Sequence, residues 1–289
     1  MKLPHDPLWP RAQSLFTAEV RGHSDVTLVG IPASQTSLSP SSAHETPAAI
    51  RSALLRYSTA HSDPRVSLER LILRDAGNVS SPDDDEQIAI GQLSKLKAET
   101  ELLIALGGDN SVSYAAFKAT GATGLITLDA HYDLRDGISN GSPVRRLIEA
   151  GLDGKKVVQI GIADFSNSSE YAKRAKDFGI TVIPRRSLRS RSVSDVWAEA
   201  ISIAGGKTFV DFDMDVCDRS VVPACPAAAP GGISADEIRQ FAFMAGSSPS
   251  VIGADITEID STKDSSDERT VRLAALVVLE LIAGYSTRE

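Results

Sequence analysis

The feature that most constrains the fold of this chain is the alternation of short, almost continuously apolar runs with segments of helical period. Runs of this kind are typical of strands that are covered on both faces, and they span 26–31, 71–75, 101–106, 124–129, 157–162, 180–184, 208–213 and 251–256. The helical segments span 47–57, 86–98, 111–119, 143–150, 169–178, 192–204, 234–245 and 268–284. Strands that alternate with helices pair in parallel through right-handed crossovers. The sequence therefore predicts an α/β fold built on a parallel sheet.

We expect the whole chain, residues 1–289, to form a single domain. A length of 289 residues suits one large α/β domain. The alternation is not interrupted by an internal repeat or by a segment with the composition of an interdomain linker. Residues 1–24 precede the first predicted strand and have no regular pattern, so we expect an irregular N-terminal extension there.

Charge and composition narrow the classes of partner. The chain has 30 Lys and Arg against 38 Asp and Glu, a net charge of −8, which argues against binding to nucleic acid or to an anionic membrane. The basic run at 185–191 is more typical of a solvated connection than of a binding patch. No apolar segment approaches the ~20 residues of a membrane span, and Cys217 and Cys225 lack the spacing of a metal or redox motif. We expect a soluble cytoplasmic protein whose partner is a small molecule.

Acidic residues gather after the predicted strands, at the carboxyl ends where open α/β sheets bind ligands. The unusual polar residues at these ends are Asp109, Asn110, Asp129, His131, Asp133, Asp211, Asp213, Asp215, Asp218, Asp255 and Glu258. One pair of aspartates is common at a strand end, but several groups at one sheet edge repel strongly without a cation. Alternate residues of an extended segment face the same way, so the DxHxD motif at 129–133 directs three ligands to one point.

The chemistry of this residue set favours manganese. Many carboxylate oxygens with a single imidazole suit Mn²⁺ better than structural Zn²⁺, which prefers cysteine or more histidine. At least five candidate ligands follow two strands, at 129–133 and 213–215. This number indicates a two-metal site of the kind that activates water for hydrolysis.

The same motifs resemble those of the ureohydrolase family, which includes arginases, agmatinases and formimidoylglutamases. The chain has GGDNS for the family's GGDHS, DAHYD for DAHxD, FDMDVCD for FDxDxxDP, and an acidic C-terminal strand, at 107–111, 129–133, 212–218 and 255–260. Framework segments match in the same order at 29–51, 75–79 and 230–234. The resemblance implies a three-layer, arginase-like α/β/α fold around an eight-stranded, mainly parallel sheet. It also implies a dinuclear Mn²⁺ cluster and a homo-oligomer, either a trimer or a hexamer.

Carried over by position, the resemblance implies the metal ligands. One ion would be held by Asn110, Asp129, Asp133 and Asp213, and the other by Asp129, His131, Asp213 and Asp215. Asn110 stands where the family usually has histidine. An asparagine offers only a neutral amide oxygen, so we expect the ion next to Asn110 to be held weakly. Asp211 replaces a small polar residue of the family, and we expect it to lie outside the ligand shell.

Two arginines bear on the substrate. Arg135 follows DAHYD in a form similar to the DAHxDLR of formimidoylglutamases, and the segment 139–146 resembles their SGTPFR element, which implies that Arg145 lies near the pocket mouth. The guanidinium fork can bind a carboxylate through two hydrogen bonds. We expect Arg135 and Arg145 to bind the carboxylates of a glutamate-derived substrate. Each could instead be an ordinary surface arginine.

Three further residues have roles implied by the resemblance. Glu258 falls where arginases hold the guanidinium of their substrate, so we expect it to hold a cationic formimidoyl group; an ion pair with Arg269 or Arg272 is the alternative. Asn140 stands about where arginases have a histidine proposed as a proton shuttle, and we expect it at the substrate. Asp133 is then the candidate for orienting the attacking water and for proton transfer.

The resulting functional hypothesis is the hydrolysis of N-formimidoyl-L-glutamate to L-glutamate and formamide, a step of histidine degradation. One alternative is another amidine or guanidine hydrolase, such as a guanidino-acid hydrolase, an agmatinase or an arginase. A second alternative, from another class, is a non-catalytic relative whose metal site is weakened at Asn110.

Overall fold

The computed structural model describes residues 6–20 and 22–288, and its centre is one sheet. Eight strands follow one another across the sheet in the order β2-β1-β3-β8-β7-β4-β5-β6. Their bounds are β1 Ser24–Ile31, β2 Leu73–Asn78, β3 Thr100–Gly107, β4 Gly124–Leu128, β5 Val157–Ile160, β6 Thr181–Ile183, β7 Thr208–Asp213 and β8 Val251–Thr257. Every neighbouring pair is parallel. The predicted α/β class with eight strands is confirmed, and the pairing is parallel throughout rather than mainly parallel.

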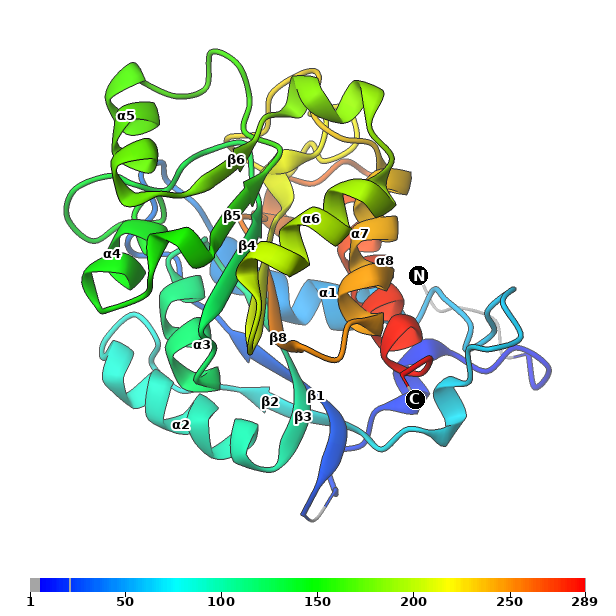
Figure 1. Cartoon of the computed structure of the whole chain (residues 1–289). Helices are drawn as coiled ribbons and strands as arrows, with labels where there is room; N and C mark the ends of the chain where they lie inside the picture. Colours follow the sequence, from blue (N-terminus) through cyan, green and yellow to red (C-terminus); the bar gives the residue numbers. More distant parts are fainter. Residues whose placement is uncertain (1–5, 21, 289) are drawn as a thin grey trace.

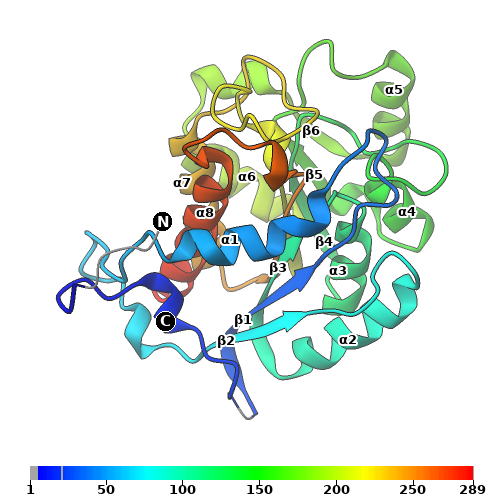
Figure 2. The same ribbon diagram turned by 180° about the vertical axis from the view of Figure 1, so that it is seen from behind.

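Helices cover both faces of the sheet and complete three layers (Figures 1 and 2). They are α1 Thr46–Leu54, α2 Glu86–Ala98, α3 Val112–Thr120, α4 Pro143–Glu149, α5 Ser169–Phe178, α6 Val193–Ala204, α7 Ala235–Ser247 and α8 Arg269–Tyr285. One core packs α1, α6, α7 and α8 against the sheet, and a second core packs α2, α3, α4 and α5 against the other face. None of the described helices is long and apolar enough to cross a membrane.

Local sequence chemistry determines where these helices begin and end. The Ser234 side chain accepts from the backbone N–H of Glu237, and the Glu237 side chain accepts from the backbone N–H of Ser234, which is the capping box that starts α7. Gly121 and Gly179 end α3 and α5 in the left-handed conformation that glycine adopts without a steric penalty. The predicted helices consequently match the structure closely, and the largest difference is at α1, which ends at Leu54 rather than at residue 57.

The N-terminal segment is irregular but packed. Its regular structure is a 3₁₀ turn at Ala12–Leu15. Ala12 is fully buried, and Thr17 forms a parallel bridge with Arg74. The predicted extension is one residue too long at its end, because Ser24 is already the first residue of β1. The part of the prediction that concerns residues 1–5 and 21 lies outside the described residues.

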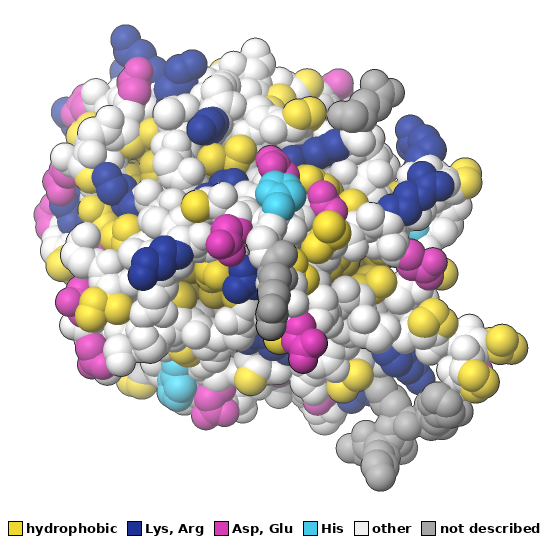
Figure 3. All heavy atoms as spheres, turned by 90° about the horizontal axis from the view of Figure 1, so that it is seen from below, with side chains coloured by type: hydrophobic (Ala, Val, Ile, Leu, Met, Phe, Trp, Pro, Cys, Tyr) yellow, Lys and Arg dark blue, Asp and Glu magenta, His cyan; other side chains and the backbone are white. Residues whose placement is uncertain are grey.

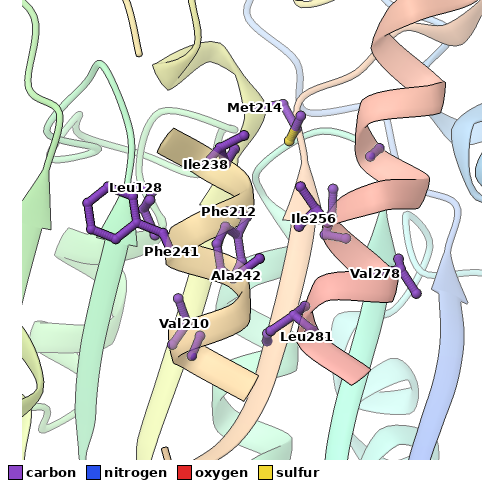
Figure 4. Close-up of a cluster of buried hydrophobic side chains, with 14 of the residues drawn as sticks. Leu128, Val210, Phe212, Met214, Ile238, Phe241, Ala242, Ile256, Val278 and Leu281 are labelled. Atoms are coloured by element: carbon purple, nitrogen blue, oxygen red, sulfur yellow. The ribbon is translucent and has the colours of Figure 1, made fainter. Parts of the chain in front are cut away.

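The helices α7 and α8 approach each other closely over the central strands. Figure 4 shows their apolar side chains above β7 and β8, with Phe212 and Ile256 from the sheet opposite Phe241 and Leu281 from the helices. A Cβ atom added at Gly246 would lie only 2.1 Å from the backbone oxygen of Leu281. The two helix backbones can come this close because glycine has no side chain.

The sheet order brings the site residues together. All strands run in one direction, so their carboxyl ends lie along the same edge. The central order β3-β8-β7-β4 places the segments after four strands side by side, and in β7 and β8 the pairs Asp211 with Asp255 and Asp213 with Thr257 share the same register. The acidic motifs are far apart in sequence but adjacent at this edge.

We expect Gly246→Ala to lower the free energy of unfolding by about 2–3 kcal/mol, because the new methyl group forces α7 and α8 apart. The matched control is Gly91→Ala, which lies in α2, where an added Cβ atom meets no atom within 4 Å. That change should raise stability by up to ~1 kcal/mol through helix propensity alone. Denaturant titration of both variants measures the two effects, and equal shifts would contradict the close approach.

Candidate active site

The carboxyl ends of β4 and β7 bring the predicted acidic ligands together in two groups. In one group, ligand atoms of Asp129, Asp133 and Asp213 lie within 4.8 Å of one another, and in the other the same holds for Asp129, His131 and Asp215. Asp129 belongs to both groups. The resemblance implied that Asp213 also contacts both ions, whereas the structure brings it into the first group only. Two adjacent ligand groups that share a carboxylate have the composition that a dinuclear metal centre needs.

The environment of these carboxylates fits divalent cations. Asp129 is fully inaccessible to solvent, and its Oδ2 atom has no hydrogen-bond partner among the described residues. Burial, and then the charge of Asp215, raise the pKa of Asp129 to about 6. Burial also raises the pKa values of Asp133 and Asp213 well above the ordinary range of a carboxyl group. Buried carboxylates this close together are stable as anions only beside a cation.

His131 is the one cationic side chain in direct contact with this set in the described part of the chain. Its Nδ1 atom lies 2.9 Å from Oδ2 of Asp215 and 3.6 Å from Oδ1 of Asp129. Burial lowers the pKa of His131, but the two carboxylates outweigh burial and raise that pKa to about 12. A metal ligand must be a neutral imidazole, so cation binding at this group is coupled to the release of a proton.

Asn110 faces the cluster through its amide nitrogen. Its Nδ2 atom donates to Oδ2 of Asp133 at 2.5 Å, while its Oδ1 atom accepts from Oγ of Ser113 at 2.7 Å and from Oγ1 of Thr257 at 3.0 Å. The expected ligand atom was the amide oxygen, which here points away from Asp133. In this orientation Asn110 binds Asp133 and presents no ligand atom to a cation beside it, because an amide nitrogen has no free lone pair to offer.

Glu258 follows β8 and is held by two hydrogen bonds. Its Oε2 atom accepts from the backbone N–H of Asn110 and its Oε1 atom accepts from Nδ2 of Asn140, both at 2.8 Å. The alternative ion pair with Arg269 or Arg272 is not formed; these arginines pair with Asp267 and Glu268 instead. Burial, followed by the charges of Asp109 and Asp215, raises the pKa of Glu258 to about 8.

Two residues of this site have a strained backbone. Glu258 has φ of 64° and Asp133 has φ of 53°, both in the left-handed region that non-glycine residues rarely adopt. Such strain is typical of residues whose side chains must point in a particular direction for function. Both side chains line the same cavity.

A cavity of about 750 Å³ opens above the acidic cluster. Its floor includes Asp133, Asp213, Asp215, His131 and Glu258, and its walls include Arg135, Asn140, Tyr171 and Arg174. This volume suits a small-molecule ligand. The cavity therefore joins an anionic floor to a wall that carries two guanidinium groups.

Arg135 is the exposed cation of this wall. No carboxylate pairs with its guanidinium group among the residues that the structure describes, and the group lies 6.0 Å from the ring centre of Tyr171. The side chain crosses directly over Gly141, where an added Cβ atom would lie 2.7 Å from Cδ of Arg135. The glycine thus leaves the space that Arg135 needs to reach over the cavity.

Arg145 is bonded to the cavity-lining residue Arg135 but is not itself one of the described residues that line the cavity. Its Nε atom donates to the backbone oxygen of Arg135 at 2.6 Å, and its terminal nitrogens bind the backbone oxygen of Gly137 and the carboxylate of Glu149. Two of its nitrogens therefore hold the loop that carries Arg135, and the third pairs within α4. Its position supports an indirect role rather than contact with a substrate.

Asn140 lines the cavity, but its amide is also engaged. Besides the bond from Nδ2 to Glu258, its Oδ1 atom accepts from the backbone N–H of Leu38 at 3.1 Å. Asn140 therefore positions Glu258. Asp211 lies two residues before Asp213 on β7 and belongs to neither ligand group, as expected.

Sequence reasoning missed the contribution of α5. Tyr171 and Arg174 lie three positions apart on one face of this helix, and both line the cavity together with the preceding segment 166–168. The guanidinium of Arg174 donates to the backbone oxygen of Leu134 at 2.6 Å and to Asp136 at 2.8 Å. The helix has the amphipathic pattern of an ordinary surface helix, so its pattern did not indicate a functional face. The polar segment before it, at 166–168, was the sequence feature that could have indicated one.

Fold and site together define an arginase-family hydrolase. The family model described as "Arginase family" matches residues 24–284, so the chain belongs to the arginase family, as its motifs predicted. Within that family it is 37% identical over 278 residues to a formimidoylglutamase of Halalkalibacterium halodurans, covering 89% of this chain and 86% of that protein.

Solved structures agree with this relationship. The formimidoylglutamase of Bacillus subtilis superposes with a TM-score of 0.91 at 30% identity, covering 99% of this chain and 95% of that one. The formiminoglutamase of Trypanosoma cruzi, solved with two Mn²⁺ ions, superposes with a TM-score of 0.90 at 26% identity, covering 97% and 100%.

We expect Asp129→Asn to bind neither Mn²⁺ ion tightly, because Asp129 is the carboxylate shared by both ligand groups. His131→Ala removes a ligand from one group only and should keep one ion. Elemental analysis after identical Mn²⁺ loading and dialysis measures the metal content per chain. The control is Asp84→Asn, because Asp84 is exposed, belongs to neither ligand group and does not line the cavity. Two bound ions in the Asp129 variant would contradict the shared site.

Proposed function

We propose that this chain hydrolyses N-formimidoyl-L-glutamate to L-glutamate and formamide, a step of histidine degradation, with two Mn²⁺ ions at the acidic cluster. The observation that carries the proposal is the unpaired guanidinium of Arg135 at the wall of a cavity whose floor is anionic. A substrate with a cationic amidine at one end and carboxylates at the other has the complementary charge pattern. The similarity to proteins named formimidoylglutamase over most of the chain supports the same reading.

The residues at the floor fit the metal. Asp129, Asp133 and Asp213 would hold one ion, and Asp129, His131 and Asp215 would hold the other. Bound there, a pair of Mn²⁺ ions supplies the Lewis acidity that makes water a nucleophile near neutral pH and that stabilises negative charge in the transition state. Asn110 would act by orienting Asp133, to which its amide nitrogen donates.

Asp133 would transfer the proton in the reaction, and Glu258 would bind the cationic end of the substrate. Asp133 faces the cavity and takes a proton from the attacking water while the water oxygen forms a bond to the amidine carbon. The bond between that carbon and the glutamate nitrogen then breaks, and the proton goes to the departing nitrogen. Glu258, held by Asn140 and by the backbone of Asn110, pairs with the cationic amidine and aligns its carbon above the floor.

Arg135 would bind a carboxylate of the substrate, and Arg145 would support it from below. The guanidinium of Arg135 is free to form a bidentate pair. Arg145 binds the backbone oxygens of Arg135 and Gly137 and so keeps the loop in place. Agmatine has no carboxylate, which makes it a poorer match than a formimidoyl or guanidino acid.

The experiment that tests the proposal is a side-by-side assay of Mn²⁺-loaded protein with formimidoylglutamate, arginine, agmatine and guanidinobutyrate. We expect formimidoylglutamate to have the highest kcat/KM. A preference for guanidinobutyrate, agmatine or arginine would assign the chain to another branch of guanidine hydrolysis. No turnover of any of the four, together with no Mn²⁺ uptake, would favour a non-catalytic relative.

We also infer that residues 1–289 act as one domain, that the protein works in the cytoplasm, and that it assembles as a trimer or hexamer. Cys217 and Cys225 are free and buried, which supports a reducing compartment.

On the face shown in Figure 3, acidic and basic side chains are interspersed, which supports a small-molecule partner rather than nucleic acid or an anionic membrane. Light scattering coupled to size-exclusion chromatography measures the oligomeric state.

We expect Arg135→Ala to lower kcat/KM for formimidoylglutamate about 30- to 150-fold, equivalent to the ~2–3 kcal/mol of a lost charge-assisted contact. Residual turnover of agmatine should not change, because agmatine has no carboxylate to lose.

Gly141→Ala should reproduce the selectivity change without removing the charge, because the methyl group displaces the Arg135 side chain. Arg70→Ala, which removes an exposed positive charge elsewhere on the surface, is the control. If Arg135→Ala lowers kcat/KM equally for all four compounds, Arg135 does not bind the substrate carboxylate.

A further inference from the structure

Two departures of this chain from its family pattern meet in space at a single hydroxyl group. Asn110 replaces a histidine and Asp211 replaces a small polar residue. Oγ1 of Thr257 lies 3.0 Å from Oδ1 of Asn110 and 3.5 Å from Oδ1 of Asp211. All three side chains are buried. A hydroxyl group has one proton, so Thr257 can donate to only one of these two oxygens at a time.

A second hydroxyl group reinforces the present orientation of the amide. Oγ of Ser113, in the first turn of α3, donates to Oδ1 of Asn110 at 2.7 Å. The amide oxygen therefore has two donors on the side away from the acidic cluster. The amide nitrogen, on the other side, donates to Oδ2 of Asp133.

The layer below Asn110 contains competing acceptors. Asp211 and Asp255 are neighbours in register on β7 and β8, and Thr127 on β4 is in register with Asp211. The two carboxyl oxygens of Asp255 and the hydroxyl of Thr127 have no hydrogen-bond partner among the described residues. Unsatisfied buried acceptors gain substantially from any donor that turns toward them. Asp211, whose Oδ1 lies 3.5 Å from Oγ1 of Thr257, is the acceptor in this layer that competes with Asn110 for the Thr257 proton.

Turning the amide exchanges nitrogen and oxygen without moving the chain. If the Thr257 hydroxyl donates its proton to Asp211, Oγ1 of Thr257 can only accept a hydrogen bond from Asn110. The Asn110 amide would then have to turn its NH₂ group, rather than its oxygen, toward Thr257. The amide oxygen would then face Asp133 and the cation position beside it. The two orientations differ in what Asn110 offers a cation: an oxygen ligand in one, and none in the other.

We propose that Ser113 and Thr257 hold the Asn110 amide in the orientation that withholds its oxygen, and that these two hydroxyl groups thereby weaken the cation site formed with Asp129, Asp133 and Asp213. The inference rests on the proposed Mn²⁺ function and adds the residues that determine the affinity of one of the two sites. Ser113 and Thr257 are positioning residues, since they act through Asn110.

The test is a calorimetric Mn²⁺ titration of the full metal-free chain. Thr257→Val and Ser113→Ala each remove one donor to the amide oxygen, so each should tighten the weaker Mn²⁺ site by about fivefold, and the double variant should tighten it further. Thr120→Val, which removes a buried hydroxyl bonded to the backbone oxygen of Phe117 at the other end of α3, is the matched control and should change nothing. Thermal melts of the metal-free variants verify that each is folded.

The Asn110→Asp background separates orientation from other effects. A carboxylate presents oxygen in both orientations, so Thr257→Val and Ser113→Ala should not tighten Mn²⁺ binding in that background. Electron paramagnetic resonance of the coupled Mn²⁺ pair gives an independent measure of how far both sites are filled.

Three results would overturn the inference. They are unchanged or weaker Mn²⁺ binding in both hydroxyl variants, or the same tightening in the Asn110→Asp background, or tightening by the Thr120 control. These outcomes leave the proposed function standing as long as wild-type protein binds two ions. A wild-type chain that takes up no Mn²⁺ would overturn the proposed function and this inference together.

Discussion

The mutual repulsion of buried carboxylates at one edge of a parallel sheet is the constraint on which the rest of this structure depends. Parallel strands point their carboxyl ends the same way, and the order β8-β7-β4 sets Asp213 beside the segment that carries Asp129 and Asp133. Such anions need a counter-charge. Without metal, protonated His131 supplies one from within the chain; a pair of divalent cations would replace that charge and supply the remainder. The surrounding residues orient the carboxylates, and none of them pairs with the shared Asp129 as a Lys or Arg would.

The outer residues turn this charge arrangement into selectivity. Asn140 and the backbone of Asn110 hold Glu258 at the cavity floor, while Arg145 holds the loop from which Arg135 reaches across Gly141. The floor favours a cationic group and the wall favours an anionic one. Under the proposed function, a ligand that carries both charges at a separation matched to the cavity would be selected over one that carries either charge alone.

The sequence was sufficient for the fold and for the acidic cluster, because both depend on patterns that are local. Apolar runs and caps predicted all eight strands and helices. The alternation argument for DxHxD was only partly right, because the motif lies beyond the end of β4, Asp133 is left-handed, and His131 and Asp133 fall into different ligand groups that share Asp129. Features that depend on side-chain direction were not accessible. Sequence position alone did not indicate that the Arg145 guanidinium turns to backbone oxygens, or that the Asn110 amide presents nitrogen to Asp133. Tyr171 and Arg174 reach the cavity only through the placement of α5.

The same buried charges link stability to pH and to cations. Burial raises the pKa of Asp129 from 3.8 to about 6 and that of Glu258 from 4.5 to about 8, so the native state without cations binds more protons than the unfolded chain. Their contribution to stability is present below pH 4 and is lost as the pH rises through these values. A bound cation replaces the protons and removes this loss. With metal bound as proposed, the cation would therefore contribute to the folding free energy at neutral pH.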